Sequence, residues 1–206
     1  MDILLDMGSG GTRFVKQFRR FNQVWGLAYL CGEPDYSAGW DKIRLKPKSI
    51  RQIQGRYDAF GVPNASMRLV TVNANNPLDS LRGIDQELAR TLVPEKGVFI
   101  SAHPVGRHPV LTEEFFSPIH FNLGHASVAE LGFRDVAGMW RVPVARFSVP
   151  GCPDIVYPAS PTILNRITEL SMPEEFRNRG SGYLYSRNDA APSISVWVRN
   201  DKPYVA

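Results

Sequence analysis

A glycine-rich segment near the N-terminus has the residue types and spacing that best suit ligand chemistry. Asp6 ends a short apolar run, and Gly8, Gly10 and Gly11 follow it closely. Glycine lets the backbone approach a ligand, and the helical pattern that begins after Thr12 would present free N–H groups at the same place. An acid just ahead of the loop suits a ligand amine. The segment therefore predicts a site for an adenosine-type ligand.

Three other interpretations of the glycine segment compete with this one. Actin-like proteins and sugar kinases have a similar phosphate loop, but that loop leads into a second strand, whereas residues 13–21 have helical spacing. Those proteins also need two such domains. Dinucleotide-binding enzymes require G-x-G-x-x-G, which the glycine spacing here does not match. A glycine turn that holds no ligand is the third alternative, and it stays open.

Polar residues further along the chain could act on a bound substrate. Asn73 ends an apolar run, where it would face a reacting group at the end of a strand. His103 follows a later run and His120 comes after it, and an imidazole with a pKa near 6.5 can serve as a general base. The candidate catalytic residues are therefore Asn73, His103 and His120, although ordinary loop histidines are the simpler interpretation. The spacing of these histidines with His108 and His125 matches no zinc pattern, so no metal is expected.

Composition bounds the class of protein. The 206 residues suit one domain with a real core, and 43% of them are hydrophobic. No apolar run approaches the roughly 20 residues of a membrane span, and the acidic N-terminus does not resemble a signal peptide. Cys31 and Cys152 fit neither a metal site nor a disulfide framework, so we expect a cytoplasmic protein. A net charge of +4 and a pI of about 9.2 permit an anionic partner without requiring one, and no nucleic-acid partner is expected.

Apolar periodicity predicts strands that alternate with helices. The predicted strands are residues 3–5, 24–31, 68–72, 98–101, 136–144 and 194–198. The predicted helices are residues 14–21, 81–92, 126–131 and 163–170. Residues 42–54 follow no clear period. This alternation predicts an α/β fold with a parallel sheet and crossover helices.

Five segments, covering roughly residues 3–140, occur in the order of the motifs of one family. They are a strand, acid and Gly-x-Gly at 4–11, a Gly-Asp-Ala-like segment at 57–63, a fourth strand at 68–73, an Arg-x-Leu-x-Pro-Gly-Gly-like step at 88–100, and an approach to strand six at 129–136. In order and spacing these segments resemble class I, Rossmann-like S-adenosylmethionine-dependent methyltransferases.

The resemblance implies a particular sheet. It has seven mostly parallel strands with helices on both faces, and its last strand, here residues 194–198, is antiparallel. It binds S-adenosylmethionine across the carboxyl ends of the first strands. Because the first predicted strand starts at Ile3, we expect no counterpart of the helices that normally precede strand one.

Matched motif by motif, the resemblance also implies which residues hold the methionine and ribose parts of the cofactor. Asp6, Gly8 and Gly10 would lie against the methionine part. Either Glu33 or Asp35 would bind the ribose hydroxyls. Both acids follow the second predicted strand instead of ending it, so the choice between them stays open.

The adenine and methyl ends of the cofactor are matched in the same way. Asp58 would accept a hydrogen bond from the adenine amino group, with Ala59 beside it. Asn73 would lie under the methyl-donor region.

The sequence therefore predicts a single methyltransferase-like domain over residues 1–206, with an insertion at about 148–182 before the last strand. The first hypothesis is methyl transfer to an oxygen or nitrogen of a small-molecule acceptor, which the insertion would cover. The second is a non-catalytic methyltransferase-fold binding module or subunit, whose cofactor site a partner subunit or a second copy would cover. A nucleic-acid methyltransferase is the third, and it depends on the basic pI alone.

Overall fold

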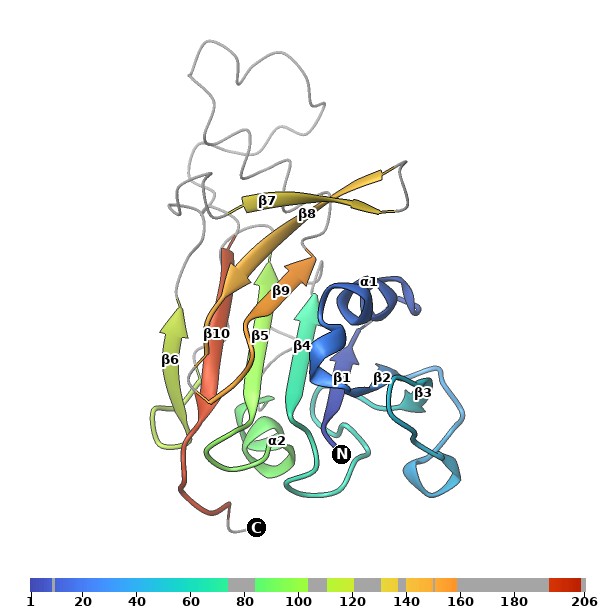
Figure 1. Cartoon of the computed structure of the whole chain (residues 1–206). Coiled ribbons are helices and arrows are strands. Elements are labelled where there is room, and N and C mark those ends of the chain that lie inside the picture. Colours follow the sequence, from blue (N-terminus) through green and yellow to red (C-terminus); the bar gives the residue numbers. More distant parts are fainter. Residues whose placement is uncertain are drawn as a thin grey trace, which may run out of the picture.

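A seven-stranded sheet forms the centre of the computed structural model, with the strand order β3-β2-β1-β4-β5-β10-β6 (Figure 1). Its strands are β1 (Ile3–Met7), β2 (Ala28–Glu33), β3 (Ile50–Gln54), β4 (Leu69–Asn73), β5 (Val98–His103), β6 (Phe116–His120) and β10 (Ser193–Arg199). The structure describes residues 1–8, 10–73, 84–103, 111–120, 131–136, 140–149, 151–158 and 193–204.

The direction of the strands confirms the predicted fold class. β1 pairs in parallel with β2 on one side and with β4 on the other, and the pairs β2–β3 and β4–β5 are also parallel. β10 lies between β5 and β6 and runs antiparallel to both. The protein is thus an α/β fold with a mostly parallel sheet and an antiparallel last strand. This is the strand order of the Rossmann-like methyltransferase fold.

Helices cover both faces of the sheet in the described part of the chain. α1 (Arg13–Phe21) packs Phe18 into a core cluster that contains Leu4 of β1. α2 (Ile84–Thr91) packs into a second cluster, which contains Leu5. Successive side chains of a strand point to opposite faces, so a strand buried on both faces has a continuous apolar sequence. No helix among the described residues is long and apolar enough to cross a membrane.

The second strand lies further along the chain than predicted. The sequence predicts a strand over 24–31, whereas β2 begins at Ala28 and ends at Glu33. A 3-10 helix at Gln23–Trp25 takes up the start of the apolar run, and Gly26 closes it in the left-handed conformation. The predicted start of the strand is wrong because the apolar residues of the 3-10 turn continue the apolar run of β2, so the sequence does not separate the two. As a result Glu33 ends the strand.

The segment that leads into the sixth strand is also wrongly predicted. The sequence places it at residues 129–136, but the strand at the edge of the sheet beside β10 is β6 (Phe116–His120). β7 (Leu131–Val136) instead pairs with β8 (Trp140–Phe147) in a separate antiparallel sheet, β7-β8-β9. The predicted strand 136–144 is divided between them. Two apolar strands so close in the chain give one continuous apolar pattern.

Other predicted elements have mixed outcomes. β3 lies at the end of residues 42–54, which follow no clear period in the sequence. The predicted helix 163–170 lies outside the described residues, as does the helix 126–131 up to its last residue. The bounds of the insertion at 148–182 stay a prediction. β9 (Ile155–Pro158) lies inside these bounds.

A single asparagine joins α1 to β9. The amide Nδ2 of the buried Asn22 donates to the carbonyl oxygen of Val156 at 2.7 Å and to that of Phe18 at 2.8 Å. Its Oδ1 accepts the N–H of Val156 at 2.9 Å. Beside this contact the ring of Tyr157 packs on Phe14, with ring centroids 5.1 Å apart. The side-chain amide therefore bonds β9 as a neighbouring strand would, and it holds β9 on the α1 face of the sheet.

Replacing this amide should destabilise the protein. Asn22→Ala should lower the free energy of unfolding by about 2–4 kcal/mol, because the buried N–H and C=O of Val156 would both lose their partner. Urea denaturation measures the change. Gln23→Ala, at the exposed next position, is the matched control and should change stability by less than about 0.5 kcal/mol. Equal losses in the two variants would contradict the role of Asn22.

Candidate functional site

The glycine segment leaves the end of β1 and leads into α1, in the predicted order of strand, loop and helix. The N–H of Gly8 donates to the carbonyl oxygen of Gly32 at 3.0 Å, which extends the contact between β1 and β2. Gly8 and Gly10 have φ values of 68° and 54°, in the left-handed region that favours glycine. At the start of α1, Thr12 makes no side-chain capping hydrogen bond. The loop is therefore shaped by backbone conformations that other residues rarely adopt.

Glu33 is the acid that the structure brings to this loop. It ends β2, and its Oε1 accepts the N–H of Gly10 at 2.5 Å. Asp35 lies two residues beyond the end of the strand and is exposed. In sheets of this kind, an acid after a strand next to a glycine loop can bind ribose hydroxyls. Of the two acids that the sequence leaves as alternatives, Glu33 is the one beside the loop.

Asp6 lies buried where β1 faces β4. It is in register with Thr71, whose hydroxyl donates to Asp6 Oδ1 at 2.7 Å. β1 and β4 are neighbours in the sheet, yet the chain passes from β1 to β2 and β3 before it returns at β4. Open α/β sheets bind ligands at such a switch point, outside the carboxyl ends of the strands. Asp6, Gly8, Gly10 and Glu33 thus lie together where this fold binds ligands.

Tyr57 belongs to the same group, although no role for it follows from the sequence. A Cβ atom on Gly8 would lie 2.1 Å from the Tyr57 hydroxyl oxygen, so the phenol rests directly on the glycine loop. Burial, followed by the negative charges of Glu33 and Asp6, raises the pKa of Tyr57 above its ordinary value. The hydroxyl is therefore protonated at neutral pH. The one signal in the sequence is its place directly before Asp58, in the segment that resembles the third motif.

Asp58 lies in an exposed turn and forms an ion pair with Arg56. Tyr57 and Asp58 form the tip of a tight turn in which Arg56 and Ala59 exchange backbone hydrogen bonds of 2.8 and 3.0 Å. The Asp58 carboxylate accepts two hydrogen bonds from Arg56, at 3.0 and 3.1 Å, and both side chains are more than half exposed. Ala59 is exposed as well. The structure therefore brings Tyr57 to the glycine loop and pairs Asp58 with Arg56.

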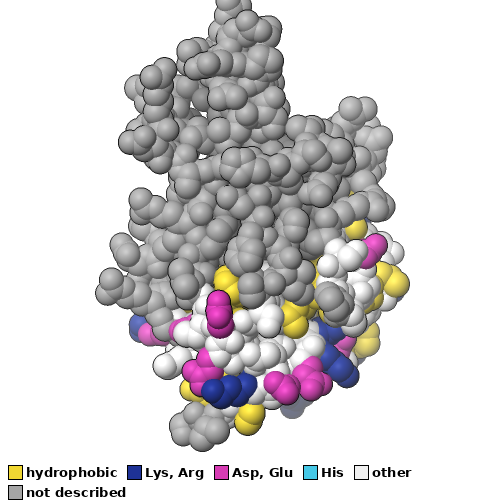
Figure 2. Space-filling model, turned by 90° about the vertical axis from the view of Figure 1, so that its left-hand side faces the viewer, with side chains coloured by type: hydrophobic (Ala, Val, Ile, Leu, Met, Phe, Trp, Pro, Cys, Tyr) yellow, Lys and Arg dark blue, Asp and Glu magenta, His cyan; other side chains and the backbone are white. Residues whose placement is uncertain are grey.

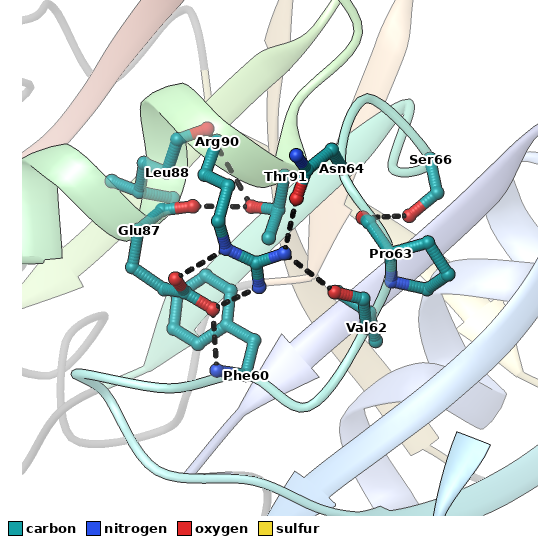
Figure 3. A network of polar contacts seen from close by, with 9 residues as sticks. All are labelled: Phe60, Val62, Pro63, Asn64, Ser66, Glu87, Leu88, Arg90 and Thr91. Carbon is teal, nitrogen blue, oxygen red and sulfur yellow. Dashed lines mark hydrogen bonds and ion pairs between the residues drawn. The ribbon is translucent and has the colours of Figure 1, made fainter. Parts of the chain in front are cut away.

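An ion pair from α2 holds the chain that follows this turn (Figure 3). Oε1 of the buried Glu87 accepts the backbone N–H of Phe60 at 2.7 Å. Arg90 donates to both carboxylate oxygens of Glu87, at 2.5 and 2.7 Å. The same guanidinium donates to the carbonyl oxygen of Val62 at 2.8 Å and to Oδ1 of Asn64 at 2.7 Å. Because Phe60 directly follows the Tyr57 turn, this network fixes where the turn lies.

Each of the three candidate catalytic residues ends a strand of the sheet: β4 and β5 are neighbours, and β10 separates β5 from β6. Asn73 ends β4 and His103 ends the adjacent β5, one residue apart in register. His120 ends β6 opposite Val196, and Val196 is opposite Ile100. The backbone of His120 is therefore about 10 Å from that of His103 across the sheet and about 10 Å along it. The backbone places Asn73 beside His103 and leaves His120 apart.

The two other histidines of the sequence, His108 and His125, lie outside the described residues. Within the described ranges, no group of three His, Cys, Asp or Glu side chains could hold a metal ion.

Solved structures that match the chain include methyltransferases, all at low sequence identity. One is a chain from a Haloferax volcanii complex between a methyltransferase activator and a protein described as a methyltransferase, with 12% identity, coverage of 97% of this chain and 83% of that one, and a TM-score of 0.44. The YcgJ protein from Bacillus subtilis has 13% identity, coverage of 98% and 92%, and a TM-score of 0.42. Geranyl diphosphate C-methyltransferase from Streptomyces coelicolor, in complex with S-adenosyl-L-homocysteine, has 16% identity, coverage of 50% and 37%, and a TM-score of 0.35.

The chain spans between 37% and 40% of the length of three of the matched methyltransferases, which are seen in four solved structures. No protein-family model matches the chain, and no curated protein matches it. The residues of the site are therefore the basis for a functional proposal.

The contact between Tyr57 and Gly8 predicts unequal costs at two glycines of the loop. Gly8→Ala should destabilise the protein by about 2–4 kcal/mol, since the new methyl group would meet the Tyr57 hydroxyl at a strained φ. Gly10→Ala is the matched control, because its Cβ would meet nothing within 4 Å and only the backbone cost of about 1–2 kcal/mol remains. Urea denaturation measures both, and adding Tyr57→Ala should recover the difference. Equal costs at the two glycines would contradict the placement of Tyr57.

Proposed function

We propose that this chain is an S-adenosylmethionine-dependent methyltransferase domain that transfers a methyl group to an oxygen or nitrogen of a small-molecule acceptor. The observation that carries this proposal is the contact between Glu33 and Gly10, beside the buried Asp6 at the crossing between β1 and β4. An acid, a glycine loop and a second acid at this point have the chemistry that an amino-acid nucleoside needs. Carboxylates accept from hydroxyl and ammonium groups, and glycine admits a close ligand.

Each end of the cofactor has a proposed partner. Asp6, Gly8 and Gly10 contact the methionine part, where the negative charge of Asp6 attracts the ammonium group. Glu33 binds the ribose hydroxyls, in preference to the exposed Asp35. Open space around the Cβ position of Gly10 supports this arrangement, since a ligand can approach the loop there.

The adenine end of the cofactor also has two proposed partners. The Asp58 carboxylate accepts a hydrogen bond from the adenine amino group, with Ala59 beside the ring. Its carboxylate is shared with Arg56 in an exposed ion pair, which costs little to rearrange because such pairs contribute about 0–1 kcal/mol.

Methyl transfer is an in-line displacement, so the protein mainly positions the donor and the acceptor. Asn73 lies under the methyl donor at the end of β4. His103 on the adjacent strand removes the acceptor proton, where the acceptor has one to lose. The distance of His120 from this point makes it the weaker candidate for a base.

The acceptor side of the site has a proposed cover. In Figure 1, β7 lies above the carboxyl end of β5 and the amino end of β10, and β8 descends from there in front of the sheet. These strands and the predicted insertion at 148–182 follow β6 and precede β10 in the chain. We propose that this part of the chain encloses the small-molecule acceptor.

A non-catalytic methyltransferase-fold binding module is the second candidate. The observation that favours it is Tyr57, whose hydroxyl lies on Gly8, where the proposed cofactor would lie. Gly10 is likewise already bonded to Glu33. In this alternative the chain satisfies its own glycine loop, and a partner subunit or a second copy covers it.

Calorimetry with two glycine variants tests the proposal. Gly10→Ala should bind S-adenosylmethionine and S-adenosylhomocysteine at least tenfold more weakly, a loss of about 1.4 kcal/mol or more. Gly26→Ala is the matched control, because Gly26 has a similar φ of 61° and an equally open Cβ position outside the loop. Its affinity should stay within about twofold of the unmodified protein. If the unmodified protein binds neither compound, the non-catalytic alternative is the better one.

A second pair of variants tests the ribose contact. Glu33→Gln keeps the shape of the side chain but loses its charge, so affinity for S-adenosylhomocysteine should fall by about 1.5–3 kcal/mol, tenfold or more. Asp35→Asn makes the same chemical change at the exposed acid and should change affinity by less than about twofold. A larger loss at Asp35 would assign the ribose to that residue instead.

A further inference from the structure

One edge of the molecule carries an unbalanced positive charge. Residues 13–20 and 42–51 hold nine of the 24 Lys and Arg of the chain and none of its 20 Asp and Glu. The rest of the chain therefore has 15 basic and 20 acidic side chains. The net charge of +4 comes from these two short segments, which we call the basic edge.

The two segments meet beside the edge strand β3, although Ile43 and Leu45 pack on the face of the sheet opposite α1. Nη1 of Arg19 in α1 donates to the carbonyl oxygen of Lys48 at 2.9 Å. β3 ends the strand order on this side of the sheet, and β6 ends it on the other (Figure 1). Viewed from the β6 side, the described residues show acidic and basic side chains next to each other (Figure 2). The chain beside β6 also contains an ion pair, between Lys202 and Glu114. Among the described residues seen from the β6 side, charges of both signs are mixed, whereas the basic edge holds charges of one sign.

The charges of the basic edge are not neutralised within the described residues. The ion pairs formed among the described residues involve cations outside the basic edge, namely Arg56, Arg68, Arg90 and Lys202. All nine cations of the basic edge except Arg19 are exposed. Like charges held together on a surface repel each other and lower stability. A polyanion bound at this edge would remove that cost.

The apolar residues of the same segments are turned into the protein. Ile43 and Leu45 pack against the core, so the alternating Arg44 and Lys46 are exposed, about 7 Å apart along the chain. α1 likewise buries Phe18. Basic surfaces that bind membranes also insert apolar side chains beside their charges. Val24, 79% exposed after the end of α1, is a single aliphatic side chain and not such a face.

We propose that the basic edge binds the phosphate backbone of a nucleic acid. Closely spaced, exposed Lys and Arg side chains suit contacts with several phosphates, and such contacts carry affinity without reading sequence. The inference does not depend on the proposed function, because a domain without methyl transfer would have the same surface. Binding at this edge is therefore weakly selective for sequence and strongly dependent on salt.

Fluorescence anisotropy with labelled single-stranded and duplex oligonucleotides, between 50 and 200 mM salt, tests this inference. The double variant Arg44→Glu/Lys46→Glu should bind at least about tenfold more weakly at low salt, and the slope of log affinity against log salt should fall by about 1.4–1.8. The control Lys96→Glu/Lys202→Glu changes the net charge equally at exposed positions away from the edge. It should stay within about threefold of the unmodified protein. Circular dichroism checks the fold, and Arg44→Gln/Lys46→Gln replaces the first variant if charge reversal unfolds it.

Three outcomes would overturn the inference. The first is that the unmodified protein binds no oligonucleotide at 50 mM salt. The second is an equal loss in the edge and control variants, which would mean that net charge alone drives binding. The third is binding to vesicles rich in phosphatidylserine without binding to oligonucleotides, which would assign the edge to a membrane surface.

Discussion

The candidate site depends on the topological switch point between β1 and β4, two neighbouring strands that are separated in the chain by β2 and β3. Because β2 and β3 lie on one side of β1 and the rest of the sheet on the other, the connections after β1 and β4 leave in opposite directions. A buried carboxylate at this point needs a partner, and the Thr71 hydroxyl donates to Asp6 from the adjoining strand. The glycine loop, Glu33 and Tyr57 are then arranged around a position that the strand order has already defined.

The second support of the site is the ion pair of Glu87 and Arg90. It lies on the opposite face of the sheet from α1, yet it bonds the chain directly after the turn that carries Tyr57. The Glu87 carboxylate is buried and also accepts the backbone N–H of Phe60, whereas Arg56 and Asp58 form an exposed pair of the kind that contributes about 0–1 kcal/mol. The base of the turn is therefore held much more firmly than the carboxylate at its tip.

Sequence patterns predict the strands that are buried on both faces, but they do not predict where a strand starts or which residues lie opposite each other in the sheet. β1, β4, β5 and β10 were recognised because a strand covered on both faces is apolar throughout. Glu33 could not be preferred over Asp35, because the turn at Gln23–Trp25 shifts the start of β2 and is itself apolar.

The same limit applies to the site residues. That Asn73 lies level with His103, while His120 lies further back, follows from strand pairing alone. Tyr57 was missed because its role depends on a glycine that is distant in the sequence. The proposed roles of Asp58, Ala59 and the histidines stay predictions.

The position of β10 has a consequence for how the protein is made. β10 lies between β5 and β6, so β6 acquires its neighbour in the sheet only after residues 121–192 have been synthesised. At roughly 5–20 residues per second this takes several seconds, during which β5 and β6 expose unpaired backbone. Pairing over such sequence separations also folds slowly. The nascent chain is therefore most exposed to aggregation along this gap until β10 fills it.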